Sequence, residues 1–363
     1  MHGTISPLTV YGSTLSYFTG KLEVYLRAKN IAYTLEPMHG RRIMPIVRRA
    51  TGTSQMPAVQ LADGRWLSDT TPIIAWLEQQ QPLPPVIPQE PVLRFFCLLL
   101  EDYADEWLWR PAMHFRWYYT GSALLQSRHL ADELTAGVPV PPPLKRWYLR
   151  RRQRGTYTVG DGVTEANHRQ VEAIYLNNLA WLDAALQQRA YLLGNSPSLA
   201  DIAFAGPFLR HFSQDPVPAE IMKQRAPAVF EWVARLWNCR PESVTADWLH
   251  EIPEDWSPWL RDIGAVYLPY LCANAEAVAA GRSRFSPTVG GVTYRKARTS
   301  RYRMWCLEQL RYHFEALPES ARSSVRDVLD RHGAWEPLWR VGDVESGVNR
   351  TLTPPFGSSH KMV

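Results

Sequence analysis

The sequence predicts an α+β protein with a small mixed domain at the N-terminus, an all-helical domain after it and an extra, mostly helical extension at the C-terminus. Three observations lead to this prediction. Up to residue 80, short runs typical of strands alternate with amphipathic helical runs. The stretch "QPLPPVIPQEP" then carries five prolines, a density that excludes a helix or a central strand. Beyond it, apolar residues recur at helical spacing.

These changes in pattern set the expected domain boundaries. We expect the mixed domain over residues 1–80, a proline-rich linker over 81–91, the all-helical domain over 92–244, and the extension with a loose tail over 245–363.

The first part is predicted to follow the order β-α-β-α-β-β-α. "LTVY" and "AYTLEPM" are strand-like, and the helical run "TGKLEVYLRAKN" between them places Leu22, Tyr25 and Leu26 on one face. "MPAVQL" is a short strand opened by a proline, and "ADGRW" predicts a hairpin because Asp-Gly tolerates the positive φ of a tight turn. "SDTTPIIAWLEQQ" is a helix with hydroxyl and acidic cap candidates and a proline in its first turn.

Helical patterns dominate the rest of the chain. "VLRFFCLLLEDYADEWLWR" predicts a long helix, and the apolar stripe in "VEAIYLNNLAWLDAALQQ" predicts a core helix. Ser198 and Asp201 form a capping box that opens a further helix. In the extension, "SPTVGGVTYRKARTSRYRM" looks extended, helices follow it, and the last twenty or so residues are expected to be loose.

Composition excludes several classes of function. No run of eighteen apolar residues is present, and the N-terminus shows no secretion signal, so we expect a cytoplasmic protein with no membrane role. The four cysteines are scattered without a CxxC pair, and no metal-binding histidine spacing occurs, which argues against a metal site. The net charge of +5 is modest, and the basic cluster "LKRWYLRRRQRG" is more typical of a solvated face than of nucleic-acid binding.

Four motifs, in the correct order, resemble the cytosolic glutathione transferase superfamily. They are the strand–serine–helix start "SYFTGKL", with Ser16 five residues before Lys21; "QMPAV", with Pro57 at the position of a cis-proline; "SDTTPIIAWLE", with Asp69 and Thr70 opening a helix; and the capping box in "YLLGNSPSLADIAFAGPF". The resemblance spans roughly residues 8 to 240 and is closest to a bacterial branch. It implies a thioredoxin-like N-terminal domain and the family's helical C-terminal domain, and it leaves the extension unexplained.

The resemblance implies an enzyme that transfers the thiolate of glutathione to a small hydrophobic electrophile, or a related glutathione-dependent lyase. Glutathione would be the co-substrate, no metal is required, and the family pattern implies a homodimer. A free thiol has a pKa of about 8.5, and lowering it to about 6.5 takes roughly 2.7 kcal/mol. One hydrogen bond to a charged acceptor supplies about 1.5–3 kcal/mol, and a helix N-terminus adds about 0.3–1 kcal/mol. A single hydroxyl at a helix start is therefore sufficient.

We expect Ser16 to be that catalytic hydroxyl. The alternative is that Ser16 only caps the helix, in which case Thr19, Tyr17 or Tyr11 is the candidate. The remaining glutathione contacts are expected from the backbone of Met56 next to Pro57, from Gln55, and from Asp69 with Thr70 at the γ-glutamyl end.

The electrophile pocket is expected between the two domains, beside the helix from Val92 to Arg110. Its predicted walls are Tyr17, Tyr103 and Trp107, with Trp109 as a further candidate, although such an aromatic stripe is more often core. The tryptophans of the extension, Trp248, Trp256 and Trp259, are expected to pack on the helical domain.

A second function is open at this point. The long extension, and the absence of a proline after Ser16 in "SYFTGK", favour a non-catalytic binding or scaffold protein that keeps the transferase fold.

Overall fold

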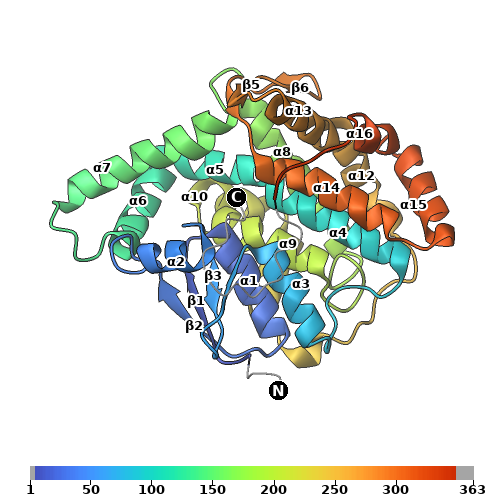
Figure 1. Cartoon of the computed structure of the whole chain (residues 1–363), viewed down its shortest axis with the longest axis horizontal. Coiled ribbons are helices and arrows are strands. Elements are labelled where there is room, and N and C mark those ends of the chain that lie inside the picture. The colour runs from blue at the N-terminus through green and yellow to red at the C-terminus, as the bar shows by residue number, and fades with distance from the viewer. Residues whose placement is uncertain (1–4, 349–363) are drawn as a thin grey trace.

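A four-stranded mixed sheet organises the N-terminal part of the computed structural model, which describes residues 5–348 (Figure 1). The strand order is β2-β1-β3-β4, with β1 parallel to β2 and antiparallel to β3, and β3 antiparallel to β4. The elements follow one another as β1 (Leu8–Gly12), α1 (Tyr17–Ala28), β2 (Tyr33–Pro37), α2 (Met44–Thr51), β3 (Ala58–Gln60), β4 (Trp66–Ser68) and α3 (Thr70–Gln80). The predicted order β-α-β-α-β-β-α is confirmed.

The two faces of this sheet are covered differently. Helices α1 and α3 pack together on the face that meets the helical domain. Helix α2 packs on the other face, where Met38, Val47, Ala58 and Trp66 form a small core of their own. Strand β1 alternates buried and partly buried residues, as a strand between two layers requires. The peptide bond before Pro57 is cis, as the motif predicted.

The segment between α3 and α4 contains no helix or strand, as its prolines predicted. The helices that follow are α4 (Pro91–Glu106), α5 (Trp109–Tyr118), α6 (Thr120–Leu134), α7 (Pro142–Gln153), α8 (His168–Leu186), α9 (Leu199–Pro207), α10 (Pro216–Arg225) and α11 (Pro227–Trp237). A π-helical turn, η1 (Arg154–Thr158), and a 3-10 turn, η2 (Val159–Asp161), follow α7, and a second π-helical turn, η3 (Phe208–Phe212), follows α9. Helices α6 and α7 form the projecting arm at the left of Figure 1.

Helix α9 lies at the centre of the molecule and is buried along its whole length. Its start is the predicted capping box: Ser198 Oγ donates to Asp201 Oδ2 at 2.7 Å, and the Ser198 amide donates to the same oxygen at 2.9 Å. Helix α9 packs against both α1 and α4. Close approach to α1 depends on Gly206, because a Cβ there would lie 2.8 Å from the Tyr17 ring. The core helix therefore fixes α1, and with it Ser16, against the helical domain.

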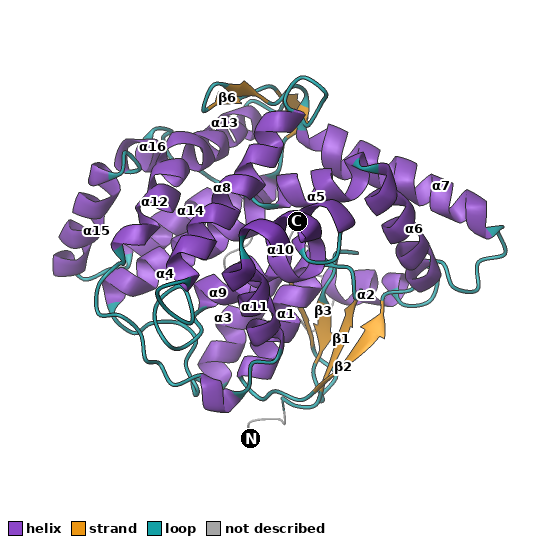
Figure 2. Cartoon of the chain, turned by 180° about the vertical axis from the view of Figure 1, so that it is seen from behind, coloured by secondary structure: helices purple, strands orange, loops and turns teal. Residues whose placement is uncertain are grey.

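The extension packs along α4 (Figures 1 and 2). Its helical segments are η4 (Pro241–Ser243), η5 (Glu254–Trp256), α12 (Ser257–Asp262), η6 (Ile263–Tyr267), α13 (Leu268–Ala279), α14 (Arg301–Glu315), α15 (Glu319–Arg331) and α16 (Trp335–Trp339). The indole of Trp256 donates to the Leu192 carbonyl at 3.1 Å, and that of Trp259 donates to Asn178 Oδ1 at 2.8 Å. The indoles of Trp256 and Trp259 are fully buried, and that of Trp248, which is partly buried, donates to the Ser196 carbonyl at 3.1 Å. All three tryptophans thus pack on the helical domain, as expected.

The segment predicted to be extended forms two short hairpins. They pair β5 (Arg284–Phe285) with β8 (Ala297–Arg298) and β6 (Thr288–Val289) with β7 (Val292–Thr293). The extended structure ends earlier than predicted, because Ser300 Oγ accepts the amide N–H of Arg303 and starts α14 at Arg301. The tail expected to be loose lies, from residue 349 on, outside the described residues.

Among residues 5–348, no helix is both long and apolar enough to cross a membrane. The same residues contain no grouping of three or more His, Cys, Asp or Glu side chains that would hold a metal ion. All four cysteines are buried free thiols.

Candidate active site

A cavity of about 590 Å³ lies where the sheet domain, the helical domain and the extension meet. The structure brings all six residues predicted to bind glutathione to its wall: Ser16, Gln55, Met56, Pro57, Asp69 and Thr70. Tyr17 lines it as well. These residues come from three separate stretches of sequence and line one cavity, so they form a candidate site.

Ser16 stands at the N-terminus of α1, half-buried and facing this cavity. Its Oγ accepts the amide N–H of Thr19 at 3.3 Å, so it caps the helix. A hydroxyl has one proton to donate in addition to its acceptor capacity. Within the described part of the chain, the Ser16 proton has no acceptor, which leaves it available to a ligand at the positive end of the helix.

The other hydroxyls considered for the catalytic role either donate a hydrogen bond within the protein or are buried. Tyr17 donates to the carbonyl of Ala104, and Tyr11 donates to Gln60 Oε1 at 3.3 Å. Thr19 is fully buried, and its hydroxyl lies against Gly12.

The two other hydroxyls of the loop are held by the helical domain. Ser13 and Thr14 both donate to the carboxylate of Glu133 on α6. Ser16 is thus the hydroxyl in this loop that both lines the cavity and has a proton free to donate.

Asp69 has an unusual backbone and an unusual carboxylate. Its φ of +70° is rare outside glycine, and such backbone conformations gather at functional sites. Oδ1 accepts a hydrogen bond from the Tyr302 hydroxyl at 3.2 Å, while Oδ2 is buried with no hydrogen-bond partner among the described residues. Burial raises the pKa of Asp69 to about 6, although the Tyr302 hydrogen bond and the charge of Lys21 act in the opposite direction. An unpaired carboxylate oxygen in a cavity favours a cationic ligand group.

A buried cluster of charged residues links α1 to the helices packed beside it. Lys21 Nζ contacts Glu101 Oε1 at 2.6 Å and Asp105 Oδ2 at 2.5 Å, and Thr71 Oγ1 donates to the same Glu101 oxygen at 2.9 Å. Burial alone lowers the pKa of Lys21, but Asp105 and Glu101 together hold that pKa above its ordinary value. The cluster ties α1, α3 and α4 together, which fixes the two helix starts relative to each other.

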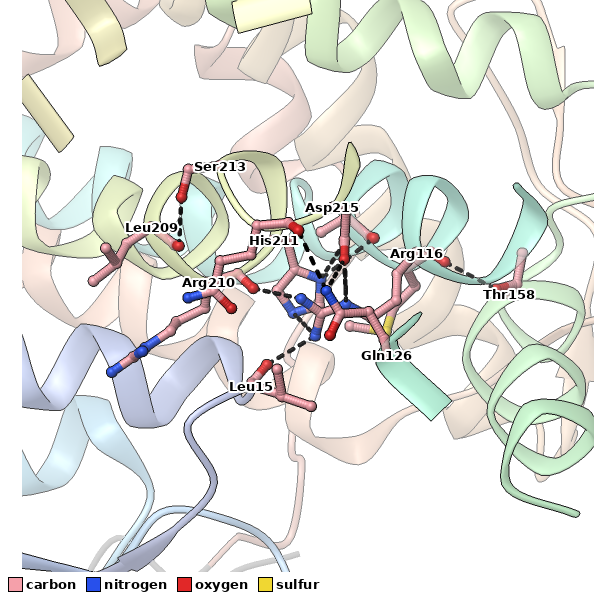
Figure 3. A network of polar contacts seen from close by, with 12 residues as sticks. Leu15, Arg116, Gln126, Thr158, Leu209, Arg210, His211, Ser213 and Asp215 are labelled. Atoms are coloured by element: carbon pink, nitrogen blue, oxygen red, sulfur yellow. Dashed lines mark hydrogen bonds and ion pairs between the residues drawn. The ribbon is translucent and has the colours of Figure 1, made fainter. Parts of the chain in front are cut away.

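Arg116 on α5 holds the loop that precedes Ser16 (Figure 3). Its Nη1 donates to the carbonyl of Leu15 at 2.8 Å, and its Nε contacts Asp215 Oδ2 at 3.0 Å. His211 Nε2 lies 3.2 Å from Arg116 Nη1, and burial together with the Arg116 charge holds the pKa of His211 well below its ordinary value. The imidazole is therefore neutral and accepts from the guanidinium, with its Nδ1 at 3.3 Å from the Ala112 carbonyl. No local sequence pattern pointed to Arg116.

Two of the residues predicted for the apolar wall of the cavity are not part of it. Tyr103 and Trp107, which were expected to line the pocket, do not line it. Both are buried: Tyr103 donates to Asp262 Oδ2 at 2.8 Å, and the Trp107 ring packs 4.6 Å from the guanidinium carbon of Arg110. The extension covers their face of the helix, so they belong to the core. Trp109, the first residue of α5, lines the cavity instead.

Two family models match the chain. Residues 10–85 match the glutathione S-transferase N-terminal domain, and residues 154–235 match the glutathione S-transferase C-terminal domain. The chain belongs to the glutathione transferase superfamily. No curated protein matches it.

Several solved structures are similar to this superfamily member over about two thirds of its length. A glutathione S-transferase from Methylobacterium radiotolerans JCM 2831, in complex with glutathione sulfonate, is 18% identical with a TM-score of 0.40, covering 69% of this chain and 99% of its own. A glutathione S-transferase from Rhodospirillum rubrum F11 is 20% identical, with a TM-score of 0.43 and coverages of 69% and 98%. The beta-etherase LigF from Sphingobium sp. strain SYK-6 is 20% identical, with a TM-score of 0.45 and coverages of 66% and 97%.

The extension contributes a part of the cavity wall that lies outside both family matches. Its residues there are Arg298, Thr299, Ser300, Tyr302 and Arg303. The only sequence signal for them is the concentration of arginines and tyrosines in "TYRKARTSRYR", which does not say what that stretch faces. This superfamily member therefore has a cavity closed on one side by a segment that the two family domains do not supply.

Proposed function

We propose that this chain is a glutathione transferase that activates glutathione through Ser16 and transfers the thiolate to a small hydrophobic electrophile. The observation that carries the proposal is the free proton of the Ser16 hydroxyl, which faces the cavity at the N-terminus of α1. A hydrogen bond to a thiolate and the helix dipole together supply about 2–4 kcal/mol, which covers the roughly 2.7 kcal/mol needed to lower the thiol pKa from about 8.5 to about 6.5.

The other lining residues suit the rest of a tripeptide. Asp69 Oδ2 can accept the ammonium of the γ-glutamyl unit, and Thr70, at the start of α3, offers a helix N-terminus to its carboxylate. Met56, before the cis bond to Pro57, would offer backbone groups to the cysteinyl unit, and Gln55 is the candidate for the glycyl end. A homodimer and a cytoplasmic location are part of the same proposal.

One observation favours a non-catalytic binding or scaffold function. The Tyr302 hydroxyl already occupies Asp69 Oδ1, so the extension takes one of the two acceptor positions that an ammonium would use. If that contact excluded glutathione, the transferase fold would remain without transferase chemistry.

The discriminating experiment combines binding with turnover. The purified full-length chain is titrated with glutathione by calorimetry, the ultraviolet absorbance of bound thiolate is followed against pH, and conjugation is measured with a neutral dinitro-substituted aryl chloride. An activated aryl ether is assayed in parallel, because a glutathione-dependent lyase uses the same thiolate.

Ser16→Ala is expected to keep glutathione affinity and to lose turnover by about 10- to 100-fold, the factor that corresponds to one hydrogen bond to a charged group. Ser13→Ala is the matched control, since the Ser13 hydroxyl is held by Glu133. Full turnover in Ser16→Ala would remove Ser16 from the mechanism. If the native chain neither bound glutathione nor lowered its thiol pKa, the non-catalytic function would stand.

A further inference from the structure

We infer that the electrophile is an aromatic molecule carrying an anionic group remote from its reacting carbon, and that Arg298 and Arg152 bind that group. The inference rests on the proposed function in one respect, because it takes the bound molecule to be the electrophile of the transferase reaction. The binding itself can be measured without turnover.

A row of aromatic rings leads from Ser16 to Arg298. Phe18, two residues after Ser16, stacks on Trp109 with ring centroids 5.7 Å apart and an interplanar angle of 16°. Trp109 in turn meets the edge of Tyr157 at 5.5 Å. All three rings line the cavity. Such a row fits a flat apolar ligand, because offset and edge contacts between rings are favourable.

The guanidinium of Arg298 stands at the far end of this row. Its Nη2 donates to the carbonyl of Thr156, the residue next to Tyr157, and it also lies against Gly160. A Cβ on residue 160 would lie about 3.0 Å from the Arg298 guanidinium, so the glycine at this position leaves room for that group. A ligand with its reacting carbon near Ser16 and its ring along Trp109 therefore points its distal substituent toward Arg298.

The arginines around the cavity are paired with carboxylates except at this end. Four arginines line the cavity: Arg116, Arg152, Arg298 and Arg303. Asp215 neutralises Arg116, while Glu106 at 3.0 Å and Asp161 at 2.7 Å neutralise Arg303.

The other two arginines, Arg152 and Arg298, lack a carboxylate partner of this kind in the described part of the chain. Arg152 and Arg298 are exposed, and across residues 5–348 neither has an ion pair with a carboxylate. Of the acidic residues in the wall, Glu106 and Asp161 are already paired, and Asp69 is bonded to Tyr302. Two guanidinium groups without a carboxylate partner among the described residues, one from α7 and one from the extension, thus line the cavity.

A further donor lines the cavity. The indole of Trp117 lines the cavity and is 5% exposed, yet its Nε1–H has no hydrogen-bond partner within the described residues. A buried donor without an acceptor is unfavourable, and an acceptor atom on a ligand would satisfy it. Guanidinium groups bind carboxylates and sulfonates through paired, charge-assisted hydrogen bonds, so a planar aromatic acid fits this wall better than a neutral arene.

The experiment compares two aryl chlorides that differ at one position. One carries a carboxylate opposite the leaving group, the other the corresponding primary amide, and each rate is divided by its uncatalysed rate with glutathione. The native enzyme is expected to prefer the carboxylate. Arg298→Gln should lower kcat/KM for the carboxylate by about 10- to 100-fold and leave the amide within about twofold. Arg298→Lys, which keeps the charge, should recover part of the loss.

Arg295→Gln is the matched control, because Arg295 is an exposed arginine of the same segment that does not line the cavity. A loss in Arg298→Gln that is equal for both substrates would overturn the inference. A higher KM for glutathione in Arg298→Gln, with an unchanged preference for the carboxylate over the amide, would also overturn the inference. That result would assign Arg298 to the glycyl carboxylate of glutathione.

A binding measurement separates failure of this inference from failure of the proposed function. Tryptophan fluorescence is titrated with naphthalene carboxylate and with naphthalene carboxamide. If no substrate is turned over, but the carboxylate binds more tightly than the amide in the native chain and not in Arg298→Gln, the transferase proposal fails and the anion site stands. The opposite result is also possible. If the neutral aryl chloride is turned over, but the carboxylate is preferred neither in the kinetics nor in the fluorescence titration, the anion site fails and the transferase proposal stands.

Discussion

The hydroxyl of Tyr302 donates a hydrogen bond to Asp69 Oδ1 at 3.2 Å, joining α14 of the extension to the start of α3 across 233 residues of sequence. Asp69 is the carboxylate proposed to accept the γ-glutamyl ammonium. The extension therefore reaches the end of the cavity that is proposed to bind glutathione, as well as the far wall.

We expect the ionisation of Asp69 to set the pH dependence of glutathione binding. Burial raises the pKa of Asp69 to about 6, and the Tyr302 hydrogen bond counteracts that rise. Only the ionised carboxylate attracts an ammonium, so affinity is present above this pKa and is lost as the pH falls through it. Tyr302→Phe removes a hydrogen bond to the ionised form, so we expect the midpoint of the loss to move to higher pH. Calorimetric titration from about pH 5 to about pH 8 measures the midpoint.

Asp69→Asn is the control for that titration. It should bind glutathione weakly at every pH and show no midpoint in this range. A native affinity that is flat with pH, or a midpoint that moves down in Tyr302→Phe, would contradict the assigned role of Asp69.

Arg116 is expected to position Ser16 and to stabilise the fold, and the two effects can be separated. Arg116→Met leaves Asp215 buried without its cation, which costs about 3–5 kcal/mol of unfolding free energy. The double variant Arg116→Met with Asp215→Leu removes both charges and should regain most of that stability. Both variants lose the donor to the Leu15 carbonyl, so we expect turnover to fall about tenfold in each. Urea denaturation and steady-state kinetics provide the two readouts; recovery of turnover along with stability would mean that Arg116 acts through stability alone.

Gly206 is expected to be essential to the contact between α9 and α1. Replacing a helical glycine with alanine normally stabilises by up to about 1 kcal/mol. At Gly206 the new Cβ would lie 2.8 Å from the ring of Tyr17, whose hydroxyl is held by Ala104. We expect Gly206→Ala to destabilise by about 1–3 kcal/mol, the range for overpacking a core. Gly121→Ala, in α6 with no atom within 4 Å of the new Cβ, should be neutral or stabilising in the same thermal-unfolding measurement.

Local patterns predicted the parts of the site that depend on neighbouring residues. The cis bond at Pro57, the start of α3 at Asp69 and Thr70, and the capping box at Ser198 are each encoded in a few consecutive residues. Their positions could therefore be predicted before any tertiary contact was known.

Contacts between distant segments could not be predicted in this way. Nothing near Tyr302 indicates Asp69, and nothing near Arg116 indicates the carbonyl of Leu15. The same limitation explains why Tyr103 and Trp107 were expected to line the pocket but lie in the core. Helical periodicity shows that a face of α4 is apolar, but not whether a cavity or the extension covers it.

Arg303 pairs with Glu106 and Asp161, and its neighbours Arg298 and Tyr302 face the ligand side of the same cavity. All three residues line the cavity, but the ion pairs that hold this segment in place are made by Arg303 and not by Arg298 or Tyr302. Divergence at residues 298 and 302 can alter which compounds are accepted while the attachment through Arg303 keeps the extension seated. A change in ligand preference would in this way require no change in how the C-terminal third packs against α4.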